Sequence, residues 1–333
     1  MIIIPLLTLT VILLTSIYWV IARRPREKII MVAHKTRDEV KNMKWESAGK
    51  VTKIIIYPVK SCSGTVVKSV KAEPLGIVDG TVRDRSFVIR TEKGSMVTAN
   101  MIPSLVLIHS SIEDNILTLK FPGAKDLTVD VTQVKENNKE MTLNIWGHPG
   151  SGLDCGEDSS RWLETILGRK CYLLYHGDLP SSRMTEEEDC PLMRNDDNPL
   201  YANLTSYMLM TTESIADLQS RLECKVDEDN FRPNILIDET KEPYDEDDWE
   251  YVMIGDAVYR NVKPCERCML TTVDPKTGKK DHNQEPLHTL KTYRCLGKPN
   301  KPHLGIHLGL DLAGVMREGD EVFVTRSAKT KKR

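Results

Sequence analysis

The first 22 residues of the chain contain no charged side chain, and most of the residues from Ile2 to Ala22 are apolar. An α-helix of this length would span about 31 Å, close to the thickness of the hydrocarbon layer of a bilayer. Tyr18 and Trp19 lie near its carboxyl end, and aromatic residues are enriched at membrane interfaces. The stretch therefore predicts a single transmembrane helix, a signal anchor with residues 2–22 in the lipid bilayer.

A cleaved secretory signal peptide is the alternative interpretation of this stretch. No basic residue precedes it, no Ala-x-Ala site follows it, and it is longer than the usual signal-peptide core of ~7 to 15 residues. Four basic residues follow it directly, at Arg23, Arg24, Arg26 and Lys28. Positive charge orients that side toward the cytosol, so we expect a single-pass anchor with the rest of the chain in the cytosol.

Charge is unevenly distributed in the rest of the chain. The formal net charge is -2, from 46 Lys plus Arg and 48 Asp plus Glu. Residues 23–50 carry nine basic and four acidic side chains, and the last eight residues carry five basic and no acidic ones. Each of these two segments therefore has a net charge of +5. Subtracting both from the total of -2 leaves a net charge of -12 for residues 51–325. A body this acidic argues against a nucleic-acid partner, since no basic surface is available to neutralise phosphates.

Short strands dominate the pattern after the basic stretch. Seven β-branched segments are separated by Gly, Asp, Asn or Pro, at 51–60, 66–72, 86–90, 105–109, 116–121, 127–131 and 142–146. Two segments, near 159–167 and 212–223, have the apolar spacing of helices that face a core. The pattern predicts a strand-rich, mixed α+β fold built on a sheet or barrel.

Two polar segments interrupt this pattern. Residues 178–201 contain three Pro and an acidic run, which predicts a flexible loop or a domain boundary. A second acidic run, at 238–250, lacks the spaced ligands and central Gly of a calcium-binding EF-hand. For that run we predict a solvated face.

Eight cysteines are present, and in a reducing cytosol they are expected to be free thiols, metal ligands or catalytic groups. Cys265 and Cys268 form a Cys-x-x-Cys motif. A thioredoxin-like pair needs a helix after the first Cys, whereas 269–273 is β-branched and predicts a strand. His282 and His288 follow at zinc-finger spacing, but the segment between is rich in turn residues. Zinc ligands, two inert thiols, and a thiolate that holds a soft metal or a labile sulfur all remain open.

Several cations accompany this motif. Arg267 directly precedes Cys268 and would favour its thiolate form. Lys60 follows an apolar strand, Arg85 precedes another, and Arg232 lies between an aromatic residue and a Pro. Together these cations could hold one anionic ligand, and a phosphorylated cofactor is the candidate.

Five motifs occur in order along the chain: YPVKSC; VRDRSFVI with SMVTANMIPSLVLI; DCGEDSSRWLETILG; NFRPNILI; and CERCMLTTVDPKTG with EPLHTLKTYR. From about residue 51 to residue 325 the chain resembles the MOSC-domain family, and more closely the mitochondrial amidoxime-reducing components. The resemblance implies a MOSC β-barrel with an N-terminal β-rich extension domain. It also implies a molybdenum cofactor, Mo-molybdopterin, and reduction of N-hydroxylated compounds such as amidoximes, hydroxylamines and N-oxides. Such proteins receive electrons from NADH through cytochrome b5 reductase and cytochrome b5.

The resemblance assigns roles to particular residues. Cys268 matches the family's molybdenum ligand and would be the catalytic residue, while Cys265 would be a nearby thiol. The residues that would bind the pterin and phosphate are Lys60, Ser61, Arg85, Thr205, Arg232 and Arg267. The match at Thr205 is incomplete, because Ser206 replaces the Pro that commonly follows it. The family's C-terminal aromatic-rich stretch corresponds to residues 303–307, which read His-Leu-Gly-Ile-His in this chain.

The predicted organisation is an anchor at 1–22, a basic linker at 23–50, a MOSC N-terminal β-rich domain at 51–177, a MOSC domain at 178–327 and a basic tail at 328–333. The mitochondrial outer membrane and the endoplasmic reticulum both accept such an anchor, and the resemblance favours the mitochondrial membrane. A molybdenum-cofactor carrier or sulfur-transfer module is the alternative function. A membrane-tethered zinc or interaction protein is a third.

Overall fold

The computed structural model describes residues 33–326 apart from 178, 180–189, 191, 198 and 298. The predicted anchor, residues 23–32 of the basic linker and the basic tail lie outside these residues. Among the helices that are described, none is both long enough and apolar enough to cross a bilayer.

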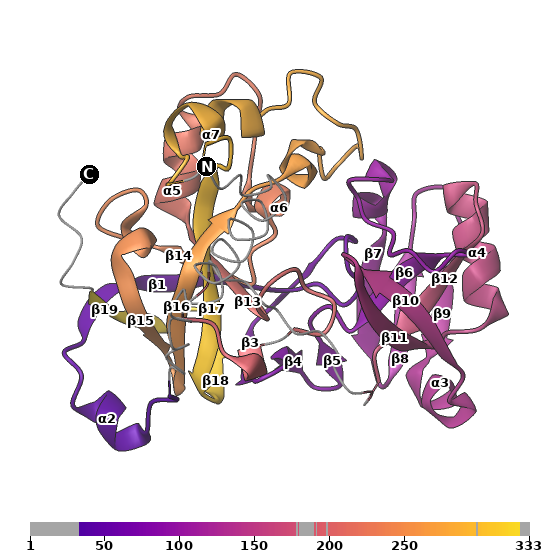
Figure 1. The fold of residues 1–333 in the computed structure, drawn as a ribbon, viewed down its shortest axis with the longest axis horizontal. Helices are drawn as coiled ribbons and strands as arrows, with labels where there is room; N and C mark the ends of the chain where they lie inside the picture. The colour runs from indigo at the N-terminus through magenta and orange to yellow at the C-terminus, as the bar shows by residue number, and fades with distance from the viewer. Residues whose placement is uncertain are drawn as a thin grey trace, which may run out of the picture. The chain divides into compact units, whose positions relative to one another are not determined.

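A barrel forms one half of the described structure (Figure 1). Eight strands follow the order β14-β13-β17-β16-β15-β19-β1-β2, and an additional pairing of β14 with β1 closes the first seven into a ring. These strands are β1 (Glu46–Ile56), β2 (Thr65–Val67), β13 (Tyr207–Thr211), β14 (Ile235–Asp238), β15 (Trp249–Ile254), β16 (Ala257–Glu266), β17 (His303–Leu312) and β19 (Glu321–Arg326).

Apolar side chains of these strands form the core of the barrel. Val51, Ile54 and Ile56 of β1 pack with residues from the other strands, including Ile235 and Ile306, and all five are almost fully buried. Burial of such side chains contributes roughly 1.5–3 kcal/mol each. The short β-branched segments of the sequence thus form a closed sheet because closure buries one face of every strand.

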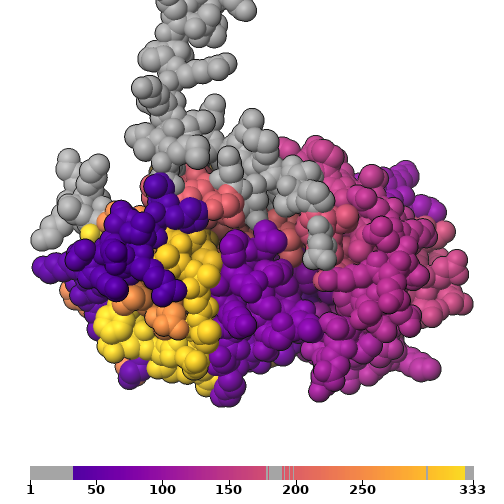
Figure 2. Space-filling model, turned by 90° about the horizontal axis from the view of Figure 1, so that it is seen from below, coloured from indigo at the N-terminus to yellow at the C-terminus, as the bar shows by residue number. Residues whose placement is uncertain are grey.

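Three smaller sheets form the rest of the structure (Figure 1). The first joins β6 (Phe87–Thr91), β10 (Glu140–Ile145), β11 (His148–Asp154) and β12 (Cys171–Tyr175); the second joins β7 (His109–Glu113), β8 (Ile116–Lys120) and β9 (Leu127–Asp130). The third joins β3 (Ser69–Glu73), β4 (Gly76–Asp79) and β5 (Val82–Arg83) with β18 (Gly314–Arg317). Because β18 comes from the C-terminal part of the chain, C-terminal residues lie against purple N-terminal strands on the surface (Figure 2).

Short helices connect and cover these sheets. The α-helices are α2 (Arg37–Lys41), α3 (Val131–Asn137), α4 (Glu157–Leu167), α5 (Thr212–Gln219), α6 (Glu228–Phe231) and α7 (Leu287–Tyr293). The 3-10 helices are η1 (Pro103–Leu107), η2 (Asn195–Asp197), η3 (Asp245–Asp248) and η4 (Met269–Thr272). Helices α4 and α5 confirm the two amphipathic helices predicted from the sequence, and Leu163 and Leu218 bury their apolar faces.

Two of the predicted strands are wrong. Residues 105–109 were expected to be extended, but η1 occupies most of them, with Pro103 at its first position, where a missing N–H costs nothing. The second is the strand predicted at 269–273, where the chain forms η4 over Met269–Thr272. The hydroxyls of Thr271 and Thr272 donate to the carbonyls of Cys268 and Met269 at 2.9 and 2.8 Å, which stabilises a helical turn despite their β-branched side chains.

The sequence predicted a solvated face for the acidic run at 238–250. This prediction is wrong for part of the run, because Asp245 and Glu246 are buried. The carboxylate of Asp245 accepts hydrogen bonds from the guanidinium of Arg326 at 2.7 Å. That of Glu246 accepts from the hydroxyls of Thr211 and Ser214 at 3.0 Å. Part of the run therefore belongs to the interior of the fold.

The buried carboxyl of Glu246 makes stability depend on pH. Burial raises its pKa from 4.5 to about 7, and the neighbouring Asp247 adds to the shift. The folded state therefore binds this proton more tightly than the unfolded state, so the stabilisation is complete below pH 4.5 and is lost as pH rises through 7. We expect Glu246→Gln, which cannot ionise, to gain roughly 3 kcal/mol over the parent protein between pH 4.5 and pH 8.

Urea unfolding of the two proteins at pH 4.5, 6 and 8 measures this difference. Glu250→Gln is the matched control, because Glu250 is exposed in the same part of the chain. A difference between Glu246→Gln and the parent protein that stays constant with pH would mean that Glu246 is already ionised when the protein is folded.

Candidate functional site

The turn after β1 brings the first predicted site residues into position. The backbone N–H of Lys60 donates to the carbonyl of Phe87 at 2.9 Å, and that of Arg85 donates to the carbonyl of Tyr57 at 2.7 Å. Ser61 has a positive φ of 70°, which turns the chain sharply away from the sheet. Lys60, Ser61 and Arg85 are thus held close together by backbone pairing between two segments.

Lys60 also connects this turn to the segment before β13. Its side chain is buried, and Nζ donates to the carbonyl of Tyr201 and to Oδ1 of Asn203, each at 2.6 Å. Thr205 lies just beyond and is also buried. The Thr205 hydroxyl donates to the carbonyl of Tyr207 at 2.9 Å and lies 3.3 Å from Nδ1 of His307.

Arg85 and Arg232 both lie against the ring of Tyr57. Their guanidinium carbons are 4.7 and 4.3 Å from the ring centroid, within the range of cation–π attraction. Arg85 pairs with Asp84 and donates to Oδ1 of Asn234 at 3.2 Å. Both arginines have a positive φ, of 48° and 61°. The fold thus gathers two predicted site cations that lie far apart in the sequence.

Arg232 contacts the Tyr57 ring, as Arg85 does, but its guanidinium is less fully hydrogen-bonded. Its side chain is 9% exposed, and Nη2 is buried without a hydrogen bond among the described residues. Burial lowers its pKa, and the positive charge of Arg85 adds to that effect. A buried cation in this state is a natural position for an anionic ligand.

Arg267, in contrast, is used by the protein itself. Its Nε donates to the carbonyl of Leu304 at 2.8 Å, and its Nη1 donates to the carbonyl of Phe231 at 2.9 Å. Its backbone N–H bonds to the carbonyl of Pro302, also at 2.8 Å. These bonds tie the start of β17 and the end of α6 to the residue before Cys268, so Arg267 positions that cysteine.

The two cysteines of the Cys-x-x-Cys motif have opposite environments. Cys268 is an exposed free thiol at the start of η4, whereas Cys265 is 6% exposed and burial raises its pKa. The described residues contain no group of three His, Cys, Asp or Glu that could hold a metal ion. His282 and His288 therefore do not complete a zinc site with these thiols, and the zinc interpretation is wrong.

Asn100 is a site residue that the sequence did not single out. Its Nδ2 donates to Sγ of Cys268 at 3.8 Å, and its Oδ1 is buried without a partner among the described residues. Lys280 holds it through a bond of 2.7 Å from Nζ to the backbone carbonyl. Asn100 lies within one of the quoted motifs, but no local pattern shows that it contacts a cysteine 168 residues away.

Comparisons with known proteins identify the class. Residues 48–170 match the MOSC N-terminal beta barrel domain, and residues 196–323 match the MOSC domain. The barrel and the β-rich part that precedes it are therefore the two domains of a MOSC-domain protein.

The relatives define the family more closely. Mitochondrial amidoxime-reducing component 1 of Mus musculus is 36% identical over 285 residues, which cover 84% of this chain and 83% of the relative. Component 1 of Homo sapiens is 35% identical, and component 2 of Homo sapiens is 34% identical, each covering 84% of both chains. This chain belongs to the family of mitochondrial amidoxime-reducing components, which confirms the resemblance seen in the sequence.

The contact between Asn100 and Cys268 predicts a change in thiol reactivity. Asn100→Ala removes the Nδ2 donor that contacts Sγ of Cys268, and with it the side chain that holds this sulfur in place. We expect alkylation of Cys268 by iodoacetamide in the cofactor-free protein to slow roughly 2- to 10-fold at pH 7.5, the effect of one lost hydrogen bond.

Mass spectrometry of the Cys268 peptide measures this rate at pH 7.5. Asn283→Ala, which truncates an exposed asparagine in the loop that follows, serves as the control. Equal alkylation rates for Asn100→Ala and Asn283→Ala would show that Asn100 has no influence on the reactivity of Cys268.

Proposed function

We propose that this protein is a molybdenum-cofactor-dependent reductase of N-hydroxylated compounds, which converts amidoximes, hydroxylamines and N-oxides to amidines or amines. The family's relatives carry the amidoxime-reducing name, and that name supports the substrate class. The observation that carries the proposal is the exposed thiol of Cys268, which directly follows the buried Arg267 and contacts Asn100, while the other cysteine of the motif, Cys265, is shielded.

The chemistry of the site suits Mo-molybdopterin. Molybdenum in a dithiolene is a soft centre, and a thiolate such as that of Cys268 is the ligand type suited to it. Oδ1 of Asn100, buried without a partner among the described residues, offers an acceptor next to that thiol. Bound there, the cofactor would supply the two-electron chemistry that removes oxygen from an N-hydroxyl group, which no side chain can perform.

The chain's own residues would hold and orient this group. Lys60, Ser61, Arg85, Thr205 and Arg232 are the proposed cofactor-binding residues, with Cys268 as the metal ligand. Lys60 and Arg85 would supply positive charge toward the phosphate and pterin. Arg267 would act mainly by positioning Cys268, because its donors are already bonded to the backbone. The hydroxyl of Thr205 donates to Tyr207, so it would offer its oxygen as an acceptor.

Electron supply and location complete the proposal. The electrons would come from NADH through cytochrome b5 reductase and cytochrome b5. The names of the relatives support a mitochondrial location for this chain. Residues 2–22 would anchor it in the outer membrane by a single span, with the remainder facing the cytosol.

The two cysteines allow a direct test of the assignment. Cys268→Ala is expected to abolish amidoxime reduction, because the metal loses its thiolate ligand. Cys265→Ala should keep most of the activity and lose about 1 kcal/mol of stability, since it removes only a small buried side chain. Both variants are assayed with an artificial electron donor, and molybdenum is measured by mass spectrometry.

Each other outcome has a defined meaning. Equal activity in the two variants would contradict the role of Cys268. Near-stoichiometric molybdenum in the parent protein without reduction of any amidoxime would point to a cofactor carrier in place of a reductase.

A further inference from the structure

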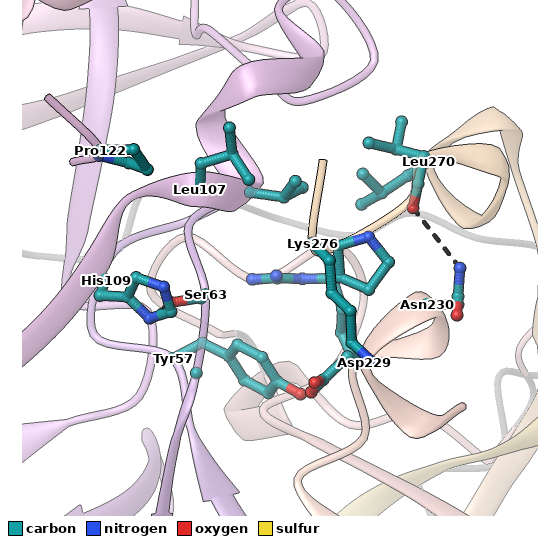
Figure 3. Close-up of a pocket in the computed structure, with 14 residues that line it drawn as sticks. Tyr57, Ser63, Leu107, His109, Pro122, Asp229, Asn230, Leu270 and Lys276 are labelled. Carbon is teal, nitrogen blue, oxygen red and sulfur yellow. Dashed lines mark hydrogen bonds between the residues drawn. The ribbon is translucent and has the colours of Figure 1, made fainter. Parts of the chain in front are cut away.

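A cavity of about 350 Å³ lies next to η4, with Leu270 and Asn230 among the residues that line it (Figure 3). Neither Cys268 nor Asn100 lines this cavity. A substrate that reacts at Cys268 therefore needs another surface for the part of it that does not react. Exposed apolar side chains near the thiol are the candidates, because sites for small molecules combine an apolar surface with a few polar groups.

Met101 is one such side chain. It is 55% exposed and directly follows Asn100, whose Nδ2 donates to Sγ of Cys268 at 3.8 Å. A bond of 2.7 Å from Nζ of Lys280 to the carbonyl of Asn100 holds this part of the chain in place. Met101 thus adds an apolar surface beside the residue that contacts the thiol.

A second exposed apolar side chain, Trp146 at the tip of the hairpin of β10 and β11, lies at the same end of this sheet. Near the end of β10, Asn144 forms a parallel bridge with Ser95. The two segments run in the same direction from that bridge, so Trp146 and Val97 both lie two residues past it. A backbone bond of 2.9 Å closes the turn at 98–101, which directly follows Val97. The tip of the hairpin and the turn next to the thiol are therefore neighbours.

Trp146 is held in a conformation that bulky residues rarely adopt. With φ values of 54° and 93°, Trp146 and Gly147 form the two-residue turn between Ile145 and His148, which pair across the hairpin. Positive φ at both positions is typical of a type I′ turn, in which Asn or Gly is preferred to a bulky side chain. The Trp146 side chain is also 54% exposed, so burial does not fully offset the strain. A strained and exposed aromatic residue points to a role in binding.

We propose that Trp146 and Met101 form an apolar platform that binds the aromatic or hydrocarbon body of the N-hydroxylated substrate. The body of the substrate packs on the indole ring and on the thioether, and its N-hydroxyl group lies toward Cys268. Aromatic pairs and contacts between sulfur and aromatic rings both favour such packing. This proposal rests on the proposed function and names its substrate class more closely, as amidoximes with a large apolar body.

Calorimetric titration of the molybdenum-loaded, full-length protein with benzamidoxime tests the platform. No electron donor is present, so binding is measured without turnover. Trp146→Asn should weaken benzamidoxime binding by about tenfold, because it removes an aromatic contact. Acetamidoxime binding should change by at most about twofold, because a methyl group buries little apolar surface.

Two further variants complete the test. Asn is a residue that this turn prefers, so the unfolding midpoint of Trp146→Asn should not fall below that of the parent protein. Met101→Gln keeps the length of the side chain but loses its apolar end, and should weaken benzamidoxime binding by about threefold. Val66→Thr is the matched control, since Val66 is also 54% exposed and lies on β2 at the end of the barrel sheet.

The proposal is overturned if Trp146→Asn binds benzamidoxime as tightly as Val66→Thr does, or if acetamidoxime loses as much affinity as benzamidoxime. Loss of molybdenum from Trp146→Asn would assign the tryptophan to the cofactor site instead. A higher KM for cytochrome b5 with unchanged benzamidoxime binding would make this surface a docking site for the electron donor.

Failure of the reductase function gives a different result. A parent protein that binds benzamidoxime through Trp146 but does not reduce it would contradict the proposed function and support the platform. Reduction of benzamidoxime with the same KM in the parent protein and in Trp146→Asn would contradict the platform alone.

Discussion

Strand β1 pairs with β14 along one edge and with β19 along the other, and this double pairing closes the seven-stranded barrel. Lys50 lies opposite Asp238 in one pairing and opposite Glu321 in the other. A shift of one residue would move Val51 and Ile54 out of the core, so the register is strongly specified. The turn that follows β1, and with it the start of the site, is therefore fixed by the closure of the barrel.

The buried cations near this turn divide into two kinds. Arg267 is bonded to the carbonyls of Leu304 and Phe231 and so stabilises the MOSC domain. Arg85 donates to Oδ1 of Asn234 and so joins the N-terminal domain to it. Arg232 lies against Tyr57. The acidic body thus uses some of its buried cations to hold the chain together and leaves Nη2 of Arg232 without a hydrogen-bond partner among the described residues.

The accuracy of the sequence predictions follows the physical origin of each pattern. The strands at 116–121 and 127–131 were predicted correctly, because alternation of apolar residues reports directly on a half-buried sheet. The segments at 105–109 and 269–273 failed, because buried 3-10 turns can also consist of β-branched and apolar residues. The burial of Glu246 was missed since its partners Thr211 and Ser214 come from a different part of the chain.

The sequence by itself determined the family, through five ordered motifs, and with it the candidate thiol and cations of the site. Only the tertiary structure decided that Cys268 is exposed while Cys265 is buried, that Asn100 contacts Cys268, and that Nη2 of Arg232 has no hydrogen-bond partner within the described residues. The physical reason is that a motif specifies residue types over a few positions. Exposure and hydrogen bonding depend instead on contacts between segments that lie far apart in the sequence and meet only when the barrel closes.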